Sequence, residues 1–329
     1  MTSDPVRVLE SAAPRAPRSE WIDHRERGSR WLLKLMAFLS LRIGRTASRG
    51  VLYAIALYFF AFAPSARGPS RRYLELALGR KPRALDRFRQ ILHFATCIHD
   101  RVYLVKGQYR RFHVTLEGEA LLRERFEAGR GALLMGAHLG SFEVVRCAGT
   151  KQPGLSVSMA MYERNARKIN AMIGAIDSGS RADIIALGQI DAMLRIAERI
   201  DRGAFVGMLA DRTLGDEPLQ EVTLLGRSAF LPTGPMRAAA LLRCPVIFMV
   251  GLYRGGNRYH LVFAPIADFA RIPPGGRDAA VTSAVERYAA LLDRYCRSDP
   301  YNWFNFYDFW RRPDHSSPAR LTCDTQAGS

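Results

Sequence analysis

Residues 131–143 read GALLMGAHLGSFE, and this stretch decides the fold. The apolar run at 132–137 has no polar interruption, which is typical of a β-strand that is buried on both faces. Gly140 then allows the chain to turn, and Ser141 is a residue type that caps helices. The stretch predicts a central strand followed at once by a helix. It places His138 at the carboxyl end of that strand, the edge at which α/β sheets carry their sites.

The same alternation of strands and helices continues along the chain. Strands are predicted at 111–115, 155–161, 183–186 and 204–210, together with a strand pair at 221–230 and a hairpin at 245–264. Helices are predicted within 70–108 and at 118–128, 142–148, 163–176, 189–202, 235–243 and 279–296. Helices that connect successive strands produce parallel pairing. The expected fold class is therefore α/β, with a mixed, mainly parallel central sheet flanked by helices and an N-terminal helical membrane-associating region.

The composition excludes several classes of protein. With 329 residues, 48% of them hydrophobic and 24% charged, the chain is neither disordered nor collagenous nor a coiled coil. Its five cysteines are far apart and form no C-x-x-C pair, so we expect neither a disulfide framework nor a zinc site. This spacing indicates a protein of a reducing compartment.

The positive charge is concentrated in the first third of the chain. The formal net charge is +17, and residues 1–112 hold 22 basic against 8 acidic side chains, whereas the remainder is nearly balanced. Nine basic residues and no acidic residue lie between Arg27 and Leu74. These basic residues flank apolar segments instead of alternating with exposed aromatics through the α/β half. The pattern favours a membrane surface over nucleic acid.

Two apolar stretches, Trp31–Leu41 and Val51–Ala63, lie on either side of a basic segment at 42–50. As a helix the second stretch is roughly 20 Å long, which is short of the ~30 Å hydrocarbon core of a bilayer. Basic residues at both of its ends predict that both ends stay on the cytoplasmic side. We expect 31–64 to form a helical hairpin that enters one leaflet or lies in the interface; a buried helix pair and a true membrane span are the alternatives.

These patterns divide the chain into four parts. A disordered leader is expected at 1–19, a basic membrane-associating helical region at 20–112, an α/β domain at 113–312 and a flexible tail at 313–329.

His138 and Glu143 are the residues best suited to chemistry. Glu143 falls in the first turn of the predicted helix, from which its carboxylate can fold back onto the imidazole. A carboxylate that accepts the proton of one ring nitrogen makes the other nitrogen a better base. Such a pair suits the deprotonation of a hydroxyl that attacks an acyl carbonyl. The alternative is that His138 is a polar strand-end residue and that Glu143 interacts with the helix dipole.

The His-x4-Glu pattern resembles the H-x4-D/E signature of the lysophospholipid acyltransferase superfamily, and its glutamate version is similar to the lipid A biosynthesis (lauroyl/myristoyl) acyltransferases. The resemblance covers residues 20–312 and includes blocks at 161–165, 208–212 and 231–235. The aromatic segment 302–310 departs from the lipid A enzymes, which carry a His-Arg pair nearby. It is closer to an acyltransferase branch found with polyene and lipid-pigment pathways, so the departure concerns the acceptor and not the class of enzyme.

The resemblance implies an acyltransferase without a metal or redox cofactor, located at the cytoplasmic face of the cell inner membrane. It would move a fatty acyl group from acyl carrier protein or coenzyme A to a hydroxyl of a lipid or glycolipid. His138 would be the general base and Glu143 its partner, while backbone N–H groups could hold the oxyanion. The substrate-binding residues that it implies are Arg164, Asp211, Arg212, Thr233 and Gly234. A non-catalytic protein that binds lipid or carrier protein at a membrane surface is the alternative function.

Two further expectations come from the residues themselves. The strongly basic first third favours acyl carrier protein over coenzyme A as the donor, because a carrier presents a helix rich in acidic side chains. Residues 301–310 contain seven aromatic side chains, of which Trp303, Phe306, Tyr307 and Trp310 would form one stripe if the segment were helical. They either close the core or line an acyl groove.

Overall fold

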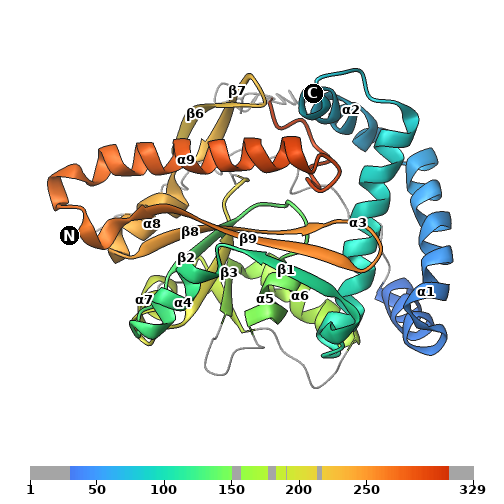
Figure 1. Cartoon of the computed structure of the whole chain (residues 1–329), viewed down its shortest axis with the longest axis horizontal. Helices are drawn as coiled ribbons and strands as arrows, with labels where there is room; N and C mark the ends of the chain where they lie inside the picture. Colours follow the sequence, from blue (N-terminus) through green and yellow to red (C-terminus); the bar gives the residue numbers. More distant parts are fainter. Residues whose placement is uncertain (1–29, 150–156, 177–182, 190, 213–216, 311–329) are drawn as a thin grey trace, which may run out of the picture.

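The computed structural model describes residues 30–149, 157–176, 183–189, 191–212 and 217–310 (Figure 1). The predicted leader at 1–19 and the predicted tail at 313–329 lie outside the described residues. The fold is a mixed, mostly parallel sheet of seven strands flanked by helices, which confirms the predicted fold class.

The sheet has the strand order β1-β9-β8-β2-β5-β3-β4. Only the β8–β9 pair, which is the predicted hairpin, is antiparallel; all other neighbours in this sheet are parallel. The strands are β1 (His113–Glu117), β2 (Leu133–Gly136), β3 (Val157–Tyr162), β4 (Ile184–Leu187), β5 (Phe205–Leu209), β8 (Pro245–Tyr253) and β9 (Arg258–Asp268). The predicted strand around residue 134 is therefore central, with β8 on one side and β5 on the other.

Helices cover both faces of this sheet. Figure 1 shows α9 (Arg277–Ser298) along one face, with α5 (Phe142–Gly149) and α6 (Glu163–Ile176) on the opposite one. The other helices of this half are α4 (Glu119–Glu127), α7 (Ala192–Asp201) and α8 (Gly234–Leu242). Successive side chains of β2 enter different cores, as its apolar run requires: Leu133 and Met135 pack with α9, and Leu134 packs with α5.

The strand pair predicted at 221–230 forms a separate antiparallel hairpin. Strand β6 (Leu219–Leu224) pairs with β7 (Arg227–Pro232), and β6 packs against α9. Thr233 and Gly234 follow β7 directly and start α8.

Three helices form the N-terminal part of the described chain. They are α1 (Arg30–Phe62), α2 (Pro64–Leu78) and α3 (Ala84–Val105), and α1 lies alongside α3 at one end of the sheet (Figure 1). The backbone of α1 is broken at Gly44, where φ is +80°. The break lies inside the basic segment that was expected to be the turn of a hairpin, and the helical part after Gly44 packs on α3. Entry of 31–64 into a membrane leaflet stays a prediction.

Within the described residues, no single helix has the length and apolar character needed to cross a membrane. One bent pair, residues 40–62 with residues 66–78 at an angle of 102°, meets the criterion by length and composition.

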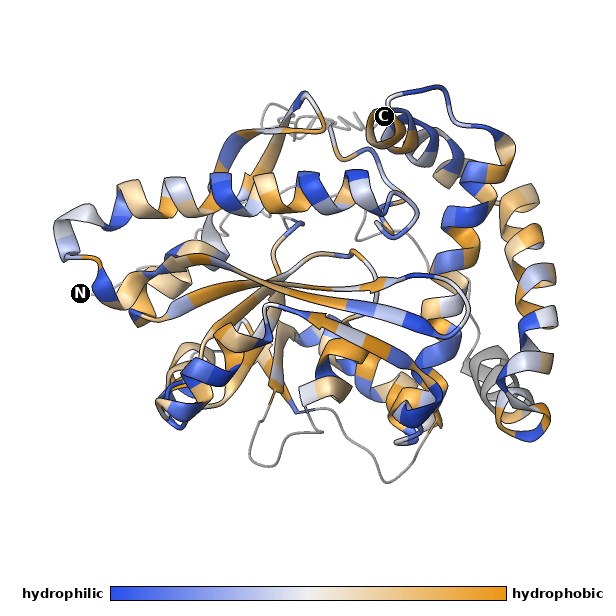
Figure 2. Cartoon of the chain, viewed as in Figure 1, coloured by the Kyte–Doolittle hydropathy of each residue, from blue (hydrophilic) through white to orange (hydrophobic). Residues whose placement is uncertain are grey.

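Much of the second half of α1 is apolar (Figure 2), and its two sides differ in their exposure. Leu52 and Ala56 are buried against the rest of the protein. The outer side exposes large apolar side chains, namely Val51, Tyr53, Leu57, Tyr58, Phe59 and Phe62. Contacts within the protein bury only the inner side of the helix. The exposed outer side is an apolar patch of the kind that binds a membrane or another protein.

A buried ion pair fastens α1 to the rest of the structure. The Arg45 guanidinium donates two hydrogen bonds to the Asp100 carboxylate, of 2.7 and 2.8 Å, and a third to the carbonyl of Gly256 in the β8–β9 turn. The Tyr259 hydroxyl also donates to Asp100, at 2.8 Å. Burial raises the pKa of Asp100, but the hydrogen bonds from His99, Arg45 and Tyr259 outweigh burial and leave this pKa lowered. Arg45, one of the basic residues at the end of the apolar stretch, is therefore engaged inside the protein.

We expect Asp100→Ala to lower the free energy of unfolding by about 3–5 kcal/mol, because it leaves the buried Arg45 charge without its partner. Chemical denaturation of the purified protein in detergent measures this loss. Glu198→Ala is the matched control, since Glu198 pairs with Arg202 at 3.9 Å on the surface; it should change stability by less than about 0.5 kcal/mol. Equal effects of the two substitutions would show that the Asp100 pair contributes no more than a surface contact.

Candidate active site

His138 lies just beyond the carboxyl end of β2, where the chain turns sharply toward α5. Gly140 has a φ of +73°, and a Cβ atom there would lie 2.0 Å from the carbonyl oxygen of Gly251 in β8. The neighbouring Ser141 N–H donates to that same oxygen at 2.7 Å. The turn thus requires glycine at 140, as the sequence predicts. The Ser141 hydroxyl makes no hydrogen bond among the described residues, so it does not cap α5.

Asp211 provides the carboxylate that contacts the imidazole. It follows β5, the parallel neighbour of β2, so the two strand ends lie at one edge of the sheet. Its Oδ1 lies 2.8 Å from His138 Nδ1, and its Oδ2 accepts the backbone N–H of His138 at 3.0 Å. The Asp211 carboxylate is fully buried, whereas 32% of the His138 side chain is exposed. One ring nitrogen is therefore held by Asp211, and the imidazole remains accessible from outside.

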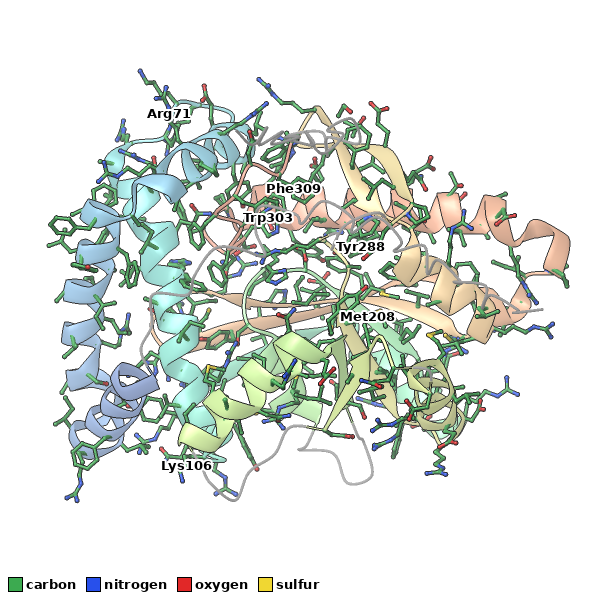
Figure 3. All side chains as sticks on the ribbon, turned by 180° about the vertical axis from the view of Figure 1, so that it is seen from behind. Arg71, Lys106, Met208, Tyr288, Trp303 and Phe309 are labelled. Atoms are coloured by element: carbon green, nitrogen blue, oxygen red, sulfur yellow. The ribbon has the colours of Figure 1, made fainter. Side chains whose placement is uncertain are left out.

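The aromatic segment after α9 completes the site. The Trp303 indole N–H donates to Asp211 Oδ2 at 3.2 Å, and the Phe304 N–H donates to the His138 carbonyl at 2.8 Å. Figure 3 labels Trp303 and Phe309 in this segment and Tyr288 of α9 nearby. The segment is not helical, so the stripe of aromatics does not form. Trp303 and Phe309 belong to the main hydrophobic core, which supports core closure, the first of the two expectations for this segment.

Electrostatics keep the imidazole neutral and the carboxylate charged. Burial lowers the pKa of His138 below its ordinary 6.5; attraction to Asp211 opposes this effect, and the Arg212 charge adds to it. Burial alone would raise the pKa of Asp211, but the interactions with His138 and Arg212 hold it well below the usual range. A neutral imidazole that donates its Nδ1 proton to a carboxylate leaves Nε2 as a free base.

Among the described residues, the Glu143 carboxylate accepts no hydrogen bond from His138. Its Oε1 instead accepts from Arg146 Nε at 2.7 Å and also from the second guanidinium nitrogen of Arg146. The Glu143 side chain is buried in the first turn of α5, as predicted. The structure thus brings together His138 and Asp211, and pairs Glu143 with Arg146.

The other predicted substrate-binding residues lie at several places around this edge. Arg212 donates to the carbonyl of Phe304 at 3.2 Å, and its guanidinium lies 5.3 Å from the centre of the Tyr307 ring. Arg164 is in the first turn of α6, directly after β3, and its side chain is outside the described parts. The Thr233 hydroxyl donates to the carbonyl of Pro218 at 3.1 Å, which fixes the start of α8.

Sequence reasoning missed two features of the site. Asp211 was expected to bind substrate, whereas here it contacts the imidazole. Its place directly after a predicted strand was the only signal in the sequence. Trp303 was expected to pack in an aromatic stripe, and nothing in its local sequence indicates a bond to Asp211. In the parts of the chain that the structure describes, no group of three or more His, Cys, Asp or Glu side chains could hold a metal ion.

An accessible imidazole held by a buried carboxylate at the carboxyl edge of a parallel sheet is an arrangement that can act as a general base. The family model of the bacterial lipid A biosynthesis acyltransferases matches residues 16–312. The chain therefore belongs to that family and is an acyltransferase of the lipid A type, with an acyl donor and a lipid acceptor. No curated protein sequence matches it significantly.

We expect kcat/KM for acyl transfer to be constant near neutral pH and to fall about tenfold per pH unit below the pKa of His138, because only the neutral ring accepts a proton. That pKa is lowered, so the midpoint should lie below 6.5. Steady-state rates across pH measure it. His260→Gln is the control, because His260 bonds to Thr115 and Glu117 and should not shape the profile. A midpoint above 7 would contradict the lowered pKa.

Proposed function

We propose that the protein is a membrane-associated O-acyltransferase that moves a fatty acyl group from acyl carrier protein, or from acyl-coenzyme A, to a hydroxyl of a lipid or glycolipid. The contact between His138 Nδ1 and Asp211 at the carboxyl edge of the sheet carries this proposal. Membership of the lipid A acyltransferase family supports the same reaction class.

In this mechanism His138 Nε2 takes the proton of the acceptor hydroxyl while the oxygen attacks the thioester carbonyl. The resulting tetrahedral intermediate carries a negative oxygen, which backbone N–H groups at the site can stabilise. Collapse of the intermediate breaks the carbon–sulfur bond, and the imidazolium returns its proton to the departing thiolate. The products are the acyl ester and the free thiol, and His138 ends neutral. Asp211 stabilises the imidazolium between the two proton transfers and fixes the tautomer.

Two carboxylates are candidates for the partner of His138. The resemblance to the H-x4-D/E signature assigns the role to Glu143. The contacts favour Asp211, which bonds both the ring and the backbone of His138, while Glu143 bonds Arg146. We therefore propose Asp211 as the partner and an organising role for Glu143 within α5.

Substitution of each carboxylate by its amide separates these assignments. We expect Asp211→Asn to lower kcat about 10²–10⁴-fold, similar to His138→Ala, because the amide cannot hold the productive tautomer as the carboxylate does. Glu143→Gln should retain far more activity, since an amide oxygen can still accept from Arg146. Transfer of radiolabelled acyl groups from both acyl carrier protein and acyl-coenzyme A measures the rates.

The reverse order, with Glu143→Gln inactive and Asp211→Asn near wild type, would assign the role to Glu143. Near-normal turnover by His138→Ala with either donor would overturn the mechanism as a whole. Circular dichroism of each variant confirms that the fold is retained.

The outer side of α1 suits attachment to a membrane surface. It exposes contiguous apolar side chains, including Leu57 and Phe62, at 59% and 63% of their full area. Exposed cations lie before and after these residues in the chain, namely Arg42 on the same helix and Arg67 and Arg71 on α2. We infer that this surface enters the cytoplasmic leaflet of the cell inner membrane, with the cations at the headgroups and at the docking surface of an acidic carrier protein.

We expect the double variant Leu57→Glu, Phe62→Glu to bind vesicles of anionic phospholipid at least about tenfold more weakly, because each apolar side chain contributes roughly 1.5–3 kcal/mol when buried. Leu194→Glu, Leu241→Glu is the matched control, since these leucines are also highly exposed but lie on α7 and α8. High salt should extract the wild-type protein poorly, because apolar burial is not screened. Unchanged binding by the α1 variant, or clean extraction by salt, would contradict this mode of attachment.

A further inference from the structure

The segment 300–304 lies between the active-site turn and the N-terminal helices. On one side, the Gly140 N–H donates to the carbonyl of Asn302, and the Phe304 N–H donates to that of His138, both at 2.8 Å. Leu139 and Trp303 thus face each other as an isolated antiparallel bridge. The segment is in this way attached to the same turn that carries the imidazole.

On the other side, α2 and α3 hold the segment through buried side chains. Gln90 of α3 is fully buried, and its amide N–H donates to the carbonyl of Trp303 at 2.7 Å. The side-chain oxygen of Gln90 accepts a hydrogen bond from the hydroxyl of Ser70, on α2, at 2.5 Å. Tyr73 of α2 donates its hydroxyl to the carbonyl of Pro300 at 2.8 Å. Each end of this short segment is therefore fixed by a helix of the N-terminal region.

The Trp303 ring is fixed as firmly as its backbone. It is fully buried, and it meets the Tyr73 ring edge to face with the ring centres 5.0 Å apart. The rings of Phe309 and Trp310 pack on it from the aromatic segment. In this position the indole N–H donates to Asp211 Oδ2, the oxygen that also accepts the backbone N–H of His138.

We propose that Trp303 is a positioning residue for the His138–Asp211 pair, and that Gln90 and Tyr73 make α2 and α3 part of the active-site scaffold. The inference rests on the proposed general-base function of His138. Two series of hydrogen bonds meet at Trp303. One runs from Ser70 through Gln90 to its backbone carbonyl, and the other runs from its indole through Asp211 to the imidazole.

Loss of the indole N–H has two consequences for the pair. The Asp211 carboxylate keeps its contacts with His138 but loses one neutral donor, so more of its negative charge acts on the imidazolium. The pKa of His138 should therefore rise. The carboxylate also loses an orienting contact, which displaces the imidazole from its working geometry and lowers kcat.

The other charged or titratable groups around the pair are not expected to produce this shift. They are Arg212, which follows Asp211, Tyr288 and Cys296 of α9, and Tyr307 of the aromatic segment. Burial raises the pKa of the Cys296 thiol well above its ordinary value, so it stays neutral where His138 titrates. Burial raises the pKa of both tyrosine hydroxyls above the ordinary value of 10.0, so they stay neutral over the range in which His138 titrates.

Trp303→Phe tests the proposal, because it keeps an aromatic ring in the core and removes the N–H. We expect kcat to fall roughly tenfold, KM for the donor to change little, and the acid midpoint of kcat/KM to rise by roughly 0.5 pH unit. Trp310→Phe is the matched control: it also removes an indole N–H from this cluster, but that N–H donates to the carbonyl of Leu224. Its pH midpoint should stay at the wild-type value.

Gln90→Leu is a second variant that leaves Trp303 intact. It should shift the pH midpoint in the same direction by a smaller amount, because the backbone of Trp303 loses its buried donor. This variant shows whether α3 acts through Trp303.

The outcomes separate this inference from the proposed function. A folded Trp303→Phe protein with the wild-type kcat and pH midpoint, alongside an inactive His138→Ala protein, would overturn the inference alone. An equal midpoint shift in Trp310→Phe would also overturn it, since the effect would then be one of general packing. Activity retained by His138→Ala would overturn the proposed function itself.

Discussion

The Asp211 carboxylate is the constraint on which the site depends. It is fully buried and accepts hydrogen bonds from the His138 ring, the His138 backbone and the Trp303 indole. A buried carboxylate is costly unless such donors surround it. These donors come from the end of β2 and from the segment after α9, so the charge is stable only when both have assembled around β5. In the proposed mechanism, the contacts that stabilise the fold here are therefore the same contacts that prepare the base.

The surroundings of the pair also set its charge state. Burial favours the neutral imidazole, whereas the interactions with His138 and Arg212 favour the ionised Asp211 carboxylate. With Nδ1 held by Asp211 and part of the ring accessible, the nitrogen left for proton transfer is Nε2. An acyl transfer to a hydroxyl needs this combination, because the base must accept a proton at neutral pH and then return it to a thiolate. The N-terminal helices contribute through Gln90 and Tyr73, although they hold none of the reacting groups.

Much of the α/β fold could be predicted from sequence, because its signals are local. The apolar run at 132–137 indicated a central strand, and the turn at Gly140 followed from residue type. The contact between His138 and Asp211 spans 73 residues and depends on β2 and β5 being neighbours, which local patterns do not specify. Gly44, inside the predicted turn, divides α1 into two helical parts, and the pairing of Arg45 with the distant Asp100 is a contact that local patterns do not indicate. Glu143 is the carboxylate nearer to His138 in the sequence, but in the structure it accepts hydrogen bonds from Arg146 instead.

The tautomer and charge of His138 test the central claim most directly. Nitrogen NMR of the ¹⁵N-histidine-labelled protein, with His138 assigned by comparison with His138→Gln, reports the protonation of each ring nitrogen. The account predicts a proton on Nδ1 and an unprotonated Nε2 at neutral pH, with the imidazolium forming only below pH 6.5. A ring protonated at Nε2 alone, or an imidazolium that persists above pH 7, would contradict it.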